Sequence, residues 1–183
     1  HVEASRMIQL VNDILQLSHL DNVSETGAAP AMETVDLLDV ARECVERQKV
    51  NARHSYISLT YLGESAPVTG SRVLLDELCQ NLCDNAIRYN RPGGKVQIIT
   101  ACTRDGHCTL TVKDNGIGIP KEAQASVFER FYRVDKSRSK ATGGTGLGLA
   151  IVKHIARIHN ARIKLDSVVD EGTTITVIFE TAS

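Results

Sequence analysis

The stretch TGGTGLGLAIVKHIARIHN, residues 142–160, places four glycines within six residues and then continues as an amphipathic helix. Glycine lets a backbone approach a ligand closely. The first turn of a helix adds unpaired N–H groups and the positive end of the helix dipole. The stretch therefore indicates a phosphate-binding turn that opens a helix over about 146–159. Taken alone, it leaves open a simple flexible turn before a core helix.

Two common phosphate-binding loops do not match this stretch. A Walker A loop needs Lys and then Ser or Thr after its last glycine, and neither Gly143 nor Gly144 leads to such a pair. A dinucleotide-binding fingerprint needs a third glycine where Leu149 stands, and it follows a strand rather than a basic polar segment. What these loops share with the stretch is a glycine turn that lets the backbone approach a phosphate, followed by the free N–H groups of a helix start.

Composition limits the other function classes. The 183 residues suit one domain, or one domain with an appendage, and 42% of them are apolar. The 21 basic and 22 acidic residues leave a net charge of −1, which gives no electrostatic case for nucleic acid or an anionic membrane as the main partner. No apolar run approaches the roughly 20 residues of a membrane span, and no signal peptide is visible. Because the chain starts inside a helical pattern, we expect it to be a piece of a longer protein.

The five cysteines are an odd number and form no CxxC pair. This pattern argues against a disulfide framework and against a zinc site. We therefore expect reduced cysteines that act as small core residues at positions 44, 79, 83, 102 and 108.

The hydrophobic pattern divides the chain into three parts. Residues 1–21 predict a long helix with a broad apolar stripe that must pack against something. The small and polar residues that follow, with Gly27 and Pro30, indicate a linker. The predicted division is 1–24 for the first helix, 25–35 for the linker and 36–183 for the main domain.

The main domain alternates helices with strands that each have one apolar face. Helices are predicted at 36–50, 71–89 and 146–159, and strands at 57–62, 96–102, 108–112, 163–165 and 175–179. Asp105-Gly106 marks a hairpin, which excludes a doubly wound parallel sheet. The predicted fold is an α/β (α+β) two-layer sandwich, in which a mixed sheet of about five strands carries three main helices on one face. A short helix near 121–127 and a mobile basic loop over 133–144 are also expected.

Three further motifs accompany the glycine stretch. They are ELCQNLCDNAIRYN at 77–90, DNGIGIP at 114–120 and FERFYRVD at 128–135. On the predicted helix, Asn81, Asp84, Asn85 and Arg88 share one polar side. The opposite side carries Leu75, Cys79, Leu82 and Ala86. Two asparagines within a helix are unfavourable for helix propensity, so a functional role is expected for them.

In this order, the four motifs resemble the N box, first glycine box, F box and second glycine box of bacterial sensor histidine kinases. The resemblance covers about residues 35–181 and implies the Bergerat-type ATP-binding fold of the catalytic domain. The run RMIQLVNDILQLSHLD, residues 6–21, is similar to the second helix of that family's dimerisation and phosphotransfer hairpin.

The resemblance implies a role for each motif residue. Asp114 would accept a hydrogen bond from the adenine amine, which favours ATP over GTP, while Gly116 and Gly118 let the backbone pass the base and ribose. Asn85 and Asn81 would hold Mg²⁺. Arg88 would meet phosphate oxygens and Tyr89 would line the nucleotide. The phosphates would rest on backbone N–H groups of Gly144, Thr145, Gly146, Leu147 and Gly148. Arg133 and Arg138 would neutralise charge during phosphoryl transfer, although a solvated basic loop is an equal alternative.

The resemblance also implies a reaction and partners. The γ-phosphoryl group would pass from Mg·ATP to a histidine, and then to an aspartate on a response regulator. None of the six histidines lies in the family's acceptor motif, so we expect the acceptor helix to lie outside these residues. Asn81 stands where ATP-hydrolysing relatives have a glutamate, so slow hydrolysis is expected. The first helix implies a homodimer of the full kinase, although this piece alone could be monomeric, in a cytoplasmic part of a membrane-anchored protein. The rival interpretations are a gyrase- or chaperone-type ATPase clamp, a non-catalytic scaffold and, less compatible with the first helix, a serine-phosphorylating anti-sigma factor kinase.

Overall fold

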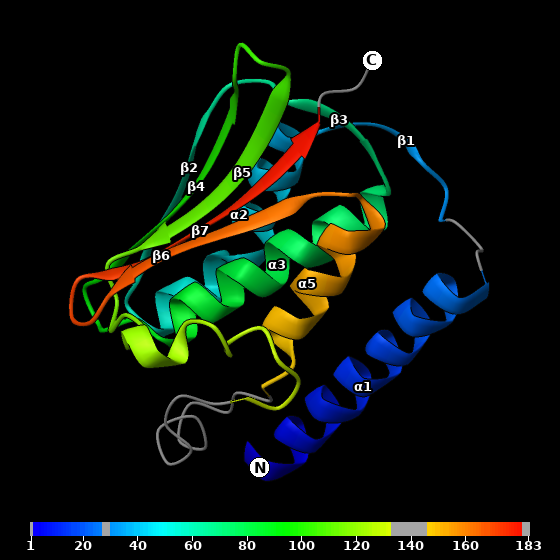
Figure 1. The fold of residues 1–183 in the computed structure, drawn as a ribbon. Coiled ribbons are helices and arrows are strands. Elements are labelled where there is room, and N and C mark those ends of the chain that lie inside the picture. The colour runs from blue at the N-terminus through cyan, green and yellow to red at the C-terminus, as the bar shows by residue number, and fades with distance from the viewer. Residues whose placement is uncertain (1, 27–29, 133–145, 181–183) are drawn as a thin grey trace.

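A five-stranded sheet with three helices on one face forms the body of the protein (Figure 1). This computed structural model describes residues 2–26, 30–132 and 146–180. The strand order is β2-β4-β5-β7-β6, with bounds β2 Ser58–Gly63, β4 Lys95–Cys102, β5 His107–Asp114, β6 Arg162–Val168 and β7 Gly172–Glu180. β2 pairs with β4 in parallel, and the other neighbours are antiparallel. The predicted mixed sheet is confirmed.

The three covering helices are α2 Leu37–His54, α3 Arg72–Arg88 and α5 Gly148–Ile158. α3 packs between α2 and α5. Their apolar faces meet the apolar side of the sheet in one core, as the sequence pattern predicted. Ser71 caps α3 by accepting a hydrogen bond from Leu74 N at Oγ, 3.4 Å away, which satisfies one of the free N–H groups of the first turn.

Helix α1, Val2–Thr26, lies apart from the sheet and contacts α5 (Figure 1). Its predicted apolar stripe is divided. Leu17 is buried, whereas Met7, Val11 and Ile14 are exposed. No helix within the described residues is long and apolar enough to cross a membrane.

Two short strands were not predicted. β1, Glu33–Asp36, pairs antiparallel with β3, Pro67–Gly70, as a separate two-stranded sheet. Each has only four residues and little alternation, so the hydrophobic pattern carries no signal for them. They matter because β1 leads directly into α2. The expected helix at 121–127 is limited to the 3-10 turn η1, Lys121–Ala123. The expected basic loop, 133–144, lies outside the described residues.

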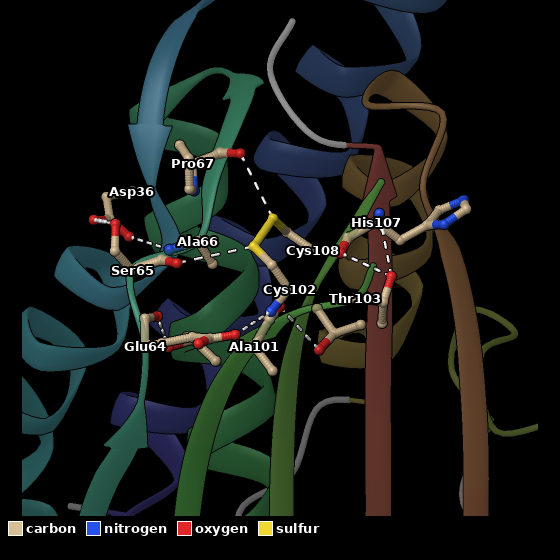
Figure 2. The surroundings of a disulfide bond; sticks show 12 residues. Asp36, Glu64, Ser65, Ala66, Pro67, Ala101, Cys102, Thr103, His107 and Cys108 are labelled. Carbon is tan, nitrogen blue, oxygen red and sulfur yellow. Dashed lines mark hydrogen bonds between the residues drawn. A yellow bond between two sulfur atoms is a disulfide. The ribbon is translucent and has the colours of Figure 1, made fainter. Parts of the chain in front are cut away.

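The expectation of five reduced cysteines is wrong for one pair. A disulfide joins Cys102, at the end of β4, to Cys108, near the start of β5 (Figure 2). The β4–β5 register places these two residues directly opposite each other. The other three cysteines, at positions 44, 79 and 83, are free and buried, as expected.

Candidate functional site

The predicted motifs meet around one cavity of about 250 Å³. It lies between the polar side of α3, the loop after β5, the start of α5 and part of α1. Of the residues predicted for the site, eight line this cavity: Asn81, Asn85, Arg88, Tyr89, Asp114, Gly118, Gly146 and Gly148. Predicted site residues as far apart in the sequence as Asn81 and Gly148 therefore contribute to one binding volume.

The polar wall of the cavity comes from α3. Asn81, Asp84, Asn85 and Arg88 lie on its cavity side because residues three or four apart share a helix face. Arg88 is not free for a ligand in this structure, since its guanidinium lies 3.2 Å from a carboxylate oxygen of Asp84. A ligand with more negative charge than one carboxylate would compete for the same guanidinium.

Asn81 carries an unmet hydrogen-bonding group. Its Nδ2 is buried and makes no hydrogen bond of acceptable geometry within the described residues. A buried donor without an acceptor costs about 1–3 kcal/mol. Gly148 lies opposite, where a Cβ atom would come only 3.7 Å from Asn81 Oδ1. The Asn81 side chain therefore turns its amide oxygen toward the start of α5.

Asp114 stands at the end of β5, where the cavity meets the sheet. Its Oδ1 accepts hydrogen bonds from Gly116 N at 2.9 Å and from Thr173 N at 3.2 Å. Burial raises the pKa of Asp114 to about 6, although both hydrogen bonds act to lower it. Since both bonds reach Oδ1, Oδ2 is left to accept from a ligand in the cavity.

The loop after β5 needs its glycines for close packing against the protein's own backbone. A Cβ atom on Gly118, whose φ is +72°, would lie 2.2 Å from Val168 O. A Cβ atom on Gly116 would lie 2.4 Å from Tyr89 O. The loop thus runs tightly between the end of α3 and the β6–β7 turn. Gly118 lines the cavity and Gly116 does not, and their expected contact with the base and ribose stays a prediction.

The start of α5 forms the third side. Gly146, Gly148 and Leu149 line the cavity. The Leu147 side chain is fully buried in the core, and its carbonyl accepts the helical hydrogen bond from Ile151 N. Leu147 is the N-cap residue of α5, and its side chain makes no capping hydrogen bond to the first amides of the helix. The expected phosphate-binding residues Arg133, Arg138, Gly144 and Thr145 lie outside the described residues.

Apolar side chains line the remainder of the cavity and suit a flat, weakly polar ring. They are Leu82, Ala86, Val112, Ile117, Ile119, Val127, Leu149 and Ile175, with Tyr132 beside them. The combination of an apolar slot with a carboxylate at its end and a polar helix beside it fits a purine nucleotide.

Sequence analysis missed six polar cavity residues. Thr173 is buried, and its backbone N–H holds Asp114 because β5 and β7 pair these two residues directly. The others are Glu77 and Gln80 from α3, Gln48 from α2, and Gln9 and Asp13 from α1. Only Glu77 and Gln80 could have been found from the sequence, because both lie within one helical turn before Asn81 on the predicted helix. The others depend on strand register and helix docking, which have no local signal.

Glu77 links α1 to the site. Burial raises the pKa of Glu77, the charge of Asp13 adds to the rise, and the side chains of Gln16 and Asn81 oppose it. Gln9 in turn donates from Nε2 to Asp13 Oδ1 at 2.9 Å. The polar end of the cavity is therefore built by two helices rather than by α3 alone.

Comparison with known proteins agrees with this geometry. Residues 70–183 match the family model of histidine kinase-, DNA gyrase B- and HSP90-like ATPases. A sensor-like histidine kinase, SenX3 of Mycolicibacterium smegmatis, is 44% identical over 180 residues, which are 96% of this chain and 45% of the relative. The chain thus spans less than half of that protein.

Two solved structures have the same fold. The mycobacterial sensor histidine kinase MprB is 32% identical with a TM-score of 0.70, and the match covers 82% of this chain and 97% of that one. Full-length ShkA, solved in complex with AMPPNP, is 24% identical with a TM-score of 0.80 over 99% of this chain and 38% of that one. The second likeness extends the shared fold over nearly all of the chain.

Proposed function

Because the chain belongs to the family of histidine kinase-, DNA gyrase B- and HSP90-like ATPases, we propose that it is the ATP-binding catalytic part of a sensor histidine kinase. The observation that carries this proposal is the joint position of Asp114 and Asn81 at one cavity, where both hydrogen bonds to the Asp114 carboxylate reach Oδ1 and the buried Asn81 amide lies beside Glu77. The similarity to SenX3 and MprB favours a kinase within this broad family.

Asp114 would read the base. Its free carboxylate oxygen accepts from the exocyclic amine of adenine, while guanine presents a carbonyl at that place and would set two acceptors against each other. The apolar residues between Asp114 and α3 hold the ring by contact. ATP should therefore bind more tightly than GTP.

The α3 asparagines fit a magnesium ion. Carboxamide oxygens are hard ligands, and Mg²⁺ usually keeps several waters while it bridges phosphates. Asn81 and Asn85 would each offer an oxygen, and the buried Nδ2 of Asn81 would then donate to a phosphate oxygen. The bound ion would neutralise charge on the phosphates. Arg88 would exchange Asp84 for a phosphate oxygen, and the first amides of α5 would receive the terminal phosphates.

Phosphoryl transfer rather than hydrolysis follows from the residue at position 81. An asparagine cannot take a proton from water, so the terminal phosphoryl group would be kept for another acceptor. We propose that this acceptor is a histidine on a helix outside the 183 residues, and that a response-regulator aspartate receives the group next. ATP turnover at a substantial rate by the chain alone would instead favour an ATPase clamp.

We also propose the division into a dimerisation helix at 1–24, a linker at 25–35 and a catalytic domain at 36–183. In the full kinase, the first helix would serve a homodimer, and the catalytic domain would lie in the cytoplasm of a membrane-anchored protein. The exposed Met7, Val11 and Ile14 of α1 support a missing helical partner.

Isothermal titration calorimetry with a non-hydrolysable ATP analogue tests the proposal. We expect saturable binding that weakens at least tenfold when EDTA replaces Mg²⁺, and weaker binding of the GTP analogue. Asp166→Asn, at an exposed side chain of β6, is the matched control and should bind like the unmodified chain. Absence of magnesium-dependent binding would favour the scaffold interpretation and refute the proposal.

A further inference from the structure

The Cys102–Cys108 disulfide joins residues that the sheet already holds together (Figure 2). The two cysteines are only six positions apart and directly opposite each other in the β4–β5 hairpin. The stabilisation that a cross-link provides grows with the length of the loop it closes, and here the loop is short and closed by strand pairing. The fold therefore does not depend on this bond, which leaves it available for reversible chemistry.

The surroundings also suit the reduced form of the pair. Cys102 Sγ lies 3.8 Å from Ser65 O, and Cys108 Sγ lies 3.7 Å from Pro67 O. These separations are suitable for weak S–H···O hydrogen bonds. Reduction would thus replace one covalent bond by two thiol donors that already face carbonyl acceptors, and the same backbone accommodates both oxidation states.

The two sulfurs differ in access. The Cys108 side chain has no exposure to solvent, whereas Cys102 is only partly buried. The free cysteines at positions 44, 79 and 83 are all buried. An external thiol or disulfide would therefore react at Cys102, because exchange requires access to the attacked sulfur.

We propose that Cys102 and Cys108 form a reversible thiol–disulfide site that exchanges with low-molecular-weight disulfides. In oxidation, the Cys102 thiolate attacks one sulfur of the small disulfide and releases one small thiolate. The Cys108 thiolate then attacks Cys102 Sγ in the mixed disulfide and releases the second. Two protein thiols lose two electrons and two protons, and one small disulfide becomes two small thiols.

The site is connected to the start of α2. The segment 64–67, whose carbonyls face the two sulfurs, also holds Asp36, the N-cap residue of α2 (Figure 2). Ser65 Oγ donates to Asp36 Oδ2 at 2.6 Å, and Ala66 N donates to Asp36 Oδ1 at 2.8 Å. Oxidation removes the two thiol donors that face the carbonyls of this segment. It should therefore loosen the junction at which the chain enters the ATP-binding domain.

Thiol counting in glutathione redox buffers tests the chemistry. After quenching and denaturation, the reduced chain should show five reactive thiols and the oxidised chain three, with full recovery on reduction. Peptide mapping should find the cross-link between Cys102 and Cys108, and Cys44→Ser should behave in the same way with one thiol fewer. Five free thiols at every ratio of oxidised to reduced glutathione, a lasting glutathione adduct on Cys102, or a bond to another cysteine would overturn the proposal.

Amide hydrogen exchange tests the connection to α2 without a variant. The amides of Leu37 and Ala66, which bond to Ala66 O and Asp36, should exchange about two- to threefold faster in the oxidised chain, the change expected for losing weak hydrogen bonds nearby. Cys102→Ser should show the same exchange in both buffers. Equal exchange of the oxidised and reduced unmodified chain would refute the connection.

Discussion

Asp114→Asn should make the ligand-free protein more stable while it weakens nucleotide binding. Burial raises the pKa of Asp114 from 3.8 to about 6, and each unit corresponds to about 1.4 kcal/mol. Holding the carboxylate ionised at pH 8 therefore costs the folded state up to about 3 kcal/mol. Asparagine carries no charge, and its Oδ1 can keep the hydrogen bonds from Gly116 and Thr173. For a chain of this size, the melting temperature should rise by up to roughly 10 °C.

The gain should depend on pH in a defined direction. Because the pKa of Asp114 is higher in the folded than in the unfolded chain, the unmodified protein loses stability as pH rises from about 4 to about 6. Asp114→Asn lacks this loss. Its advantage over the unmodified chain should be absent near pH 4, grow through the window and stay constant above about pH 7. Differential scanning calorimetry across this range measures it.

Binding should change in the opposite direction. The Nδ2 of Asp114→Asn would face the adenine amine, donor against donor, and the lost charged hydrogen bond is worth about 1.5–3 kcal/mol, or roughly 10- to 150-fold in ATP affinity. The guanine carbonyl can accept from Nδ2, so the preference for ATP over GTP should narrow or reverse. A variant that is less stable than the unmodified chain at pH 8 and binds ATP equally well would refute the assigned role.

Substitutions at three other sites test the magnesium ligands, the packing of the loop after β5 and a buried histidine. Asn85→Ala should remove the magnesium-dependent part of ATP binding while leaving melting of the ligand-free chain within about 1 kcal/mol; equal effects of EDTA before and after the change would contradict this. Gly118→Ala should destabilise by more than about 2 kcal/mol in urea unfolding because its Cβ meets backbone, whereas Gly93→Ala, also at positive φ but with nothing within 4 Å, should lose only about 1 kcal/mol. Burial lowers the pKa of His159, whose Nε2 accepts from Ser71 N. Stability should therefore fall as pH drops below about 6.5, and His159→Gln should show less of this fall.

Local patterns were enough for most of the fold. The polar and apolar sides of α3 follow helical spacing, and the strands of the β4–β5 hairpin alternate with period two, so each could be read from adjacent residues. The short strands β1 and β3 could not be predicted, because they exist only through pairing with each other. The disulfide depended on strand register, since a hairpin prediction does not say whether Cys102 faces Cys108 or a neighbour.

Some residues of the candidate site could likewise be predicted from local sequence, and others could not. Asp114 and the α3 asparagines belong to motifs whose order along the chain indicated a nucleotide site before any geometry was known. Thr173 reaches the site through the β5–β7 register, and Asp13 through the docking of α1, so neither has a local signature. The reason for Gly118 also required the structure, because its close neighbour is Val168, fifty residues later.

Helix α1 supplies Gln9 and Asp13 to the wall of the cavity. Displacing α1 would take these two polar groups away from a ligand in the cavity. The free energy of ligand binding therefore depends in part on whether α1 is docked. Thermodynamic linkage makes that dependence reciprocal: any factor by which docking of α1 alters the dissociation constant of a nucleotide is also the factor by which the nucleotide alters the docking equilibrium. A pull or twist delivered to the first 26 residues would then be converted into a change in nucleotide retention, with no need for a signal to travel through the sheet.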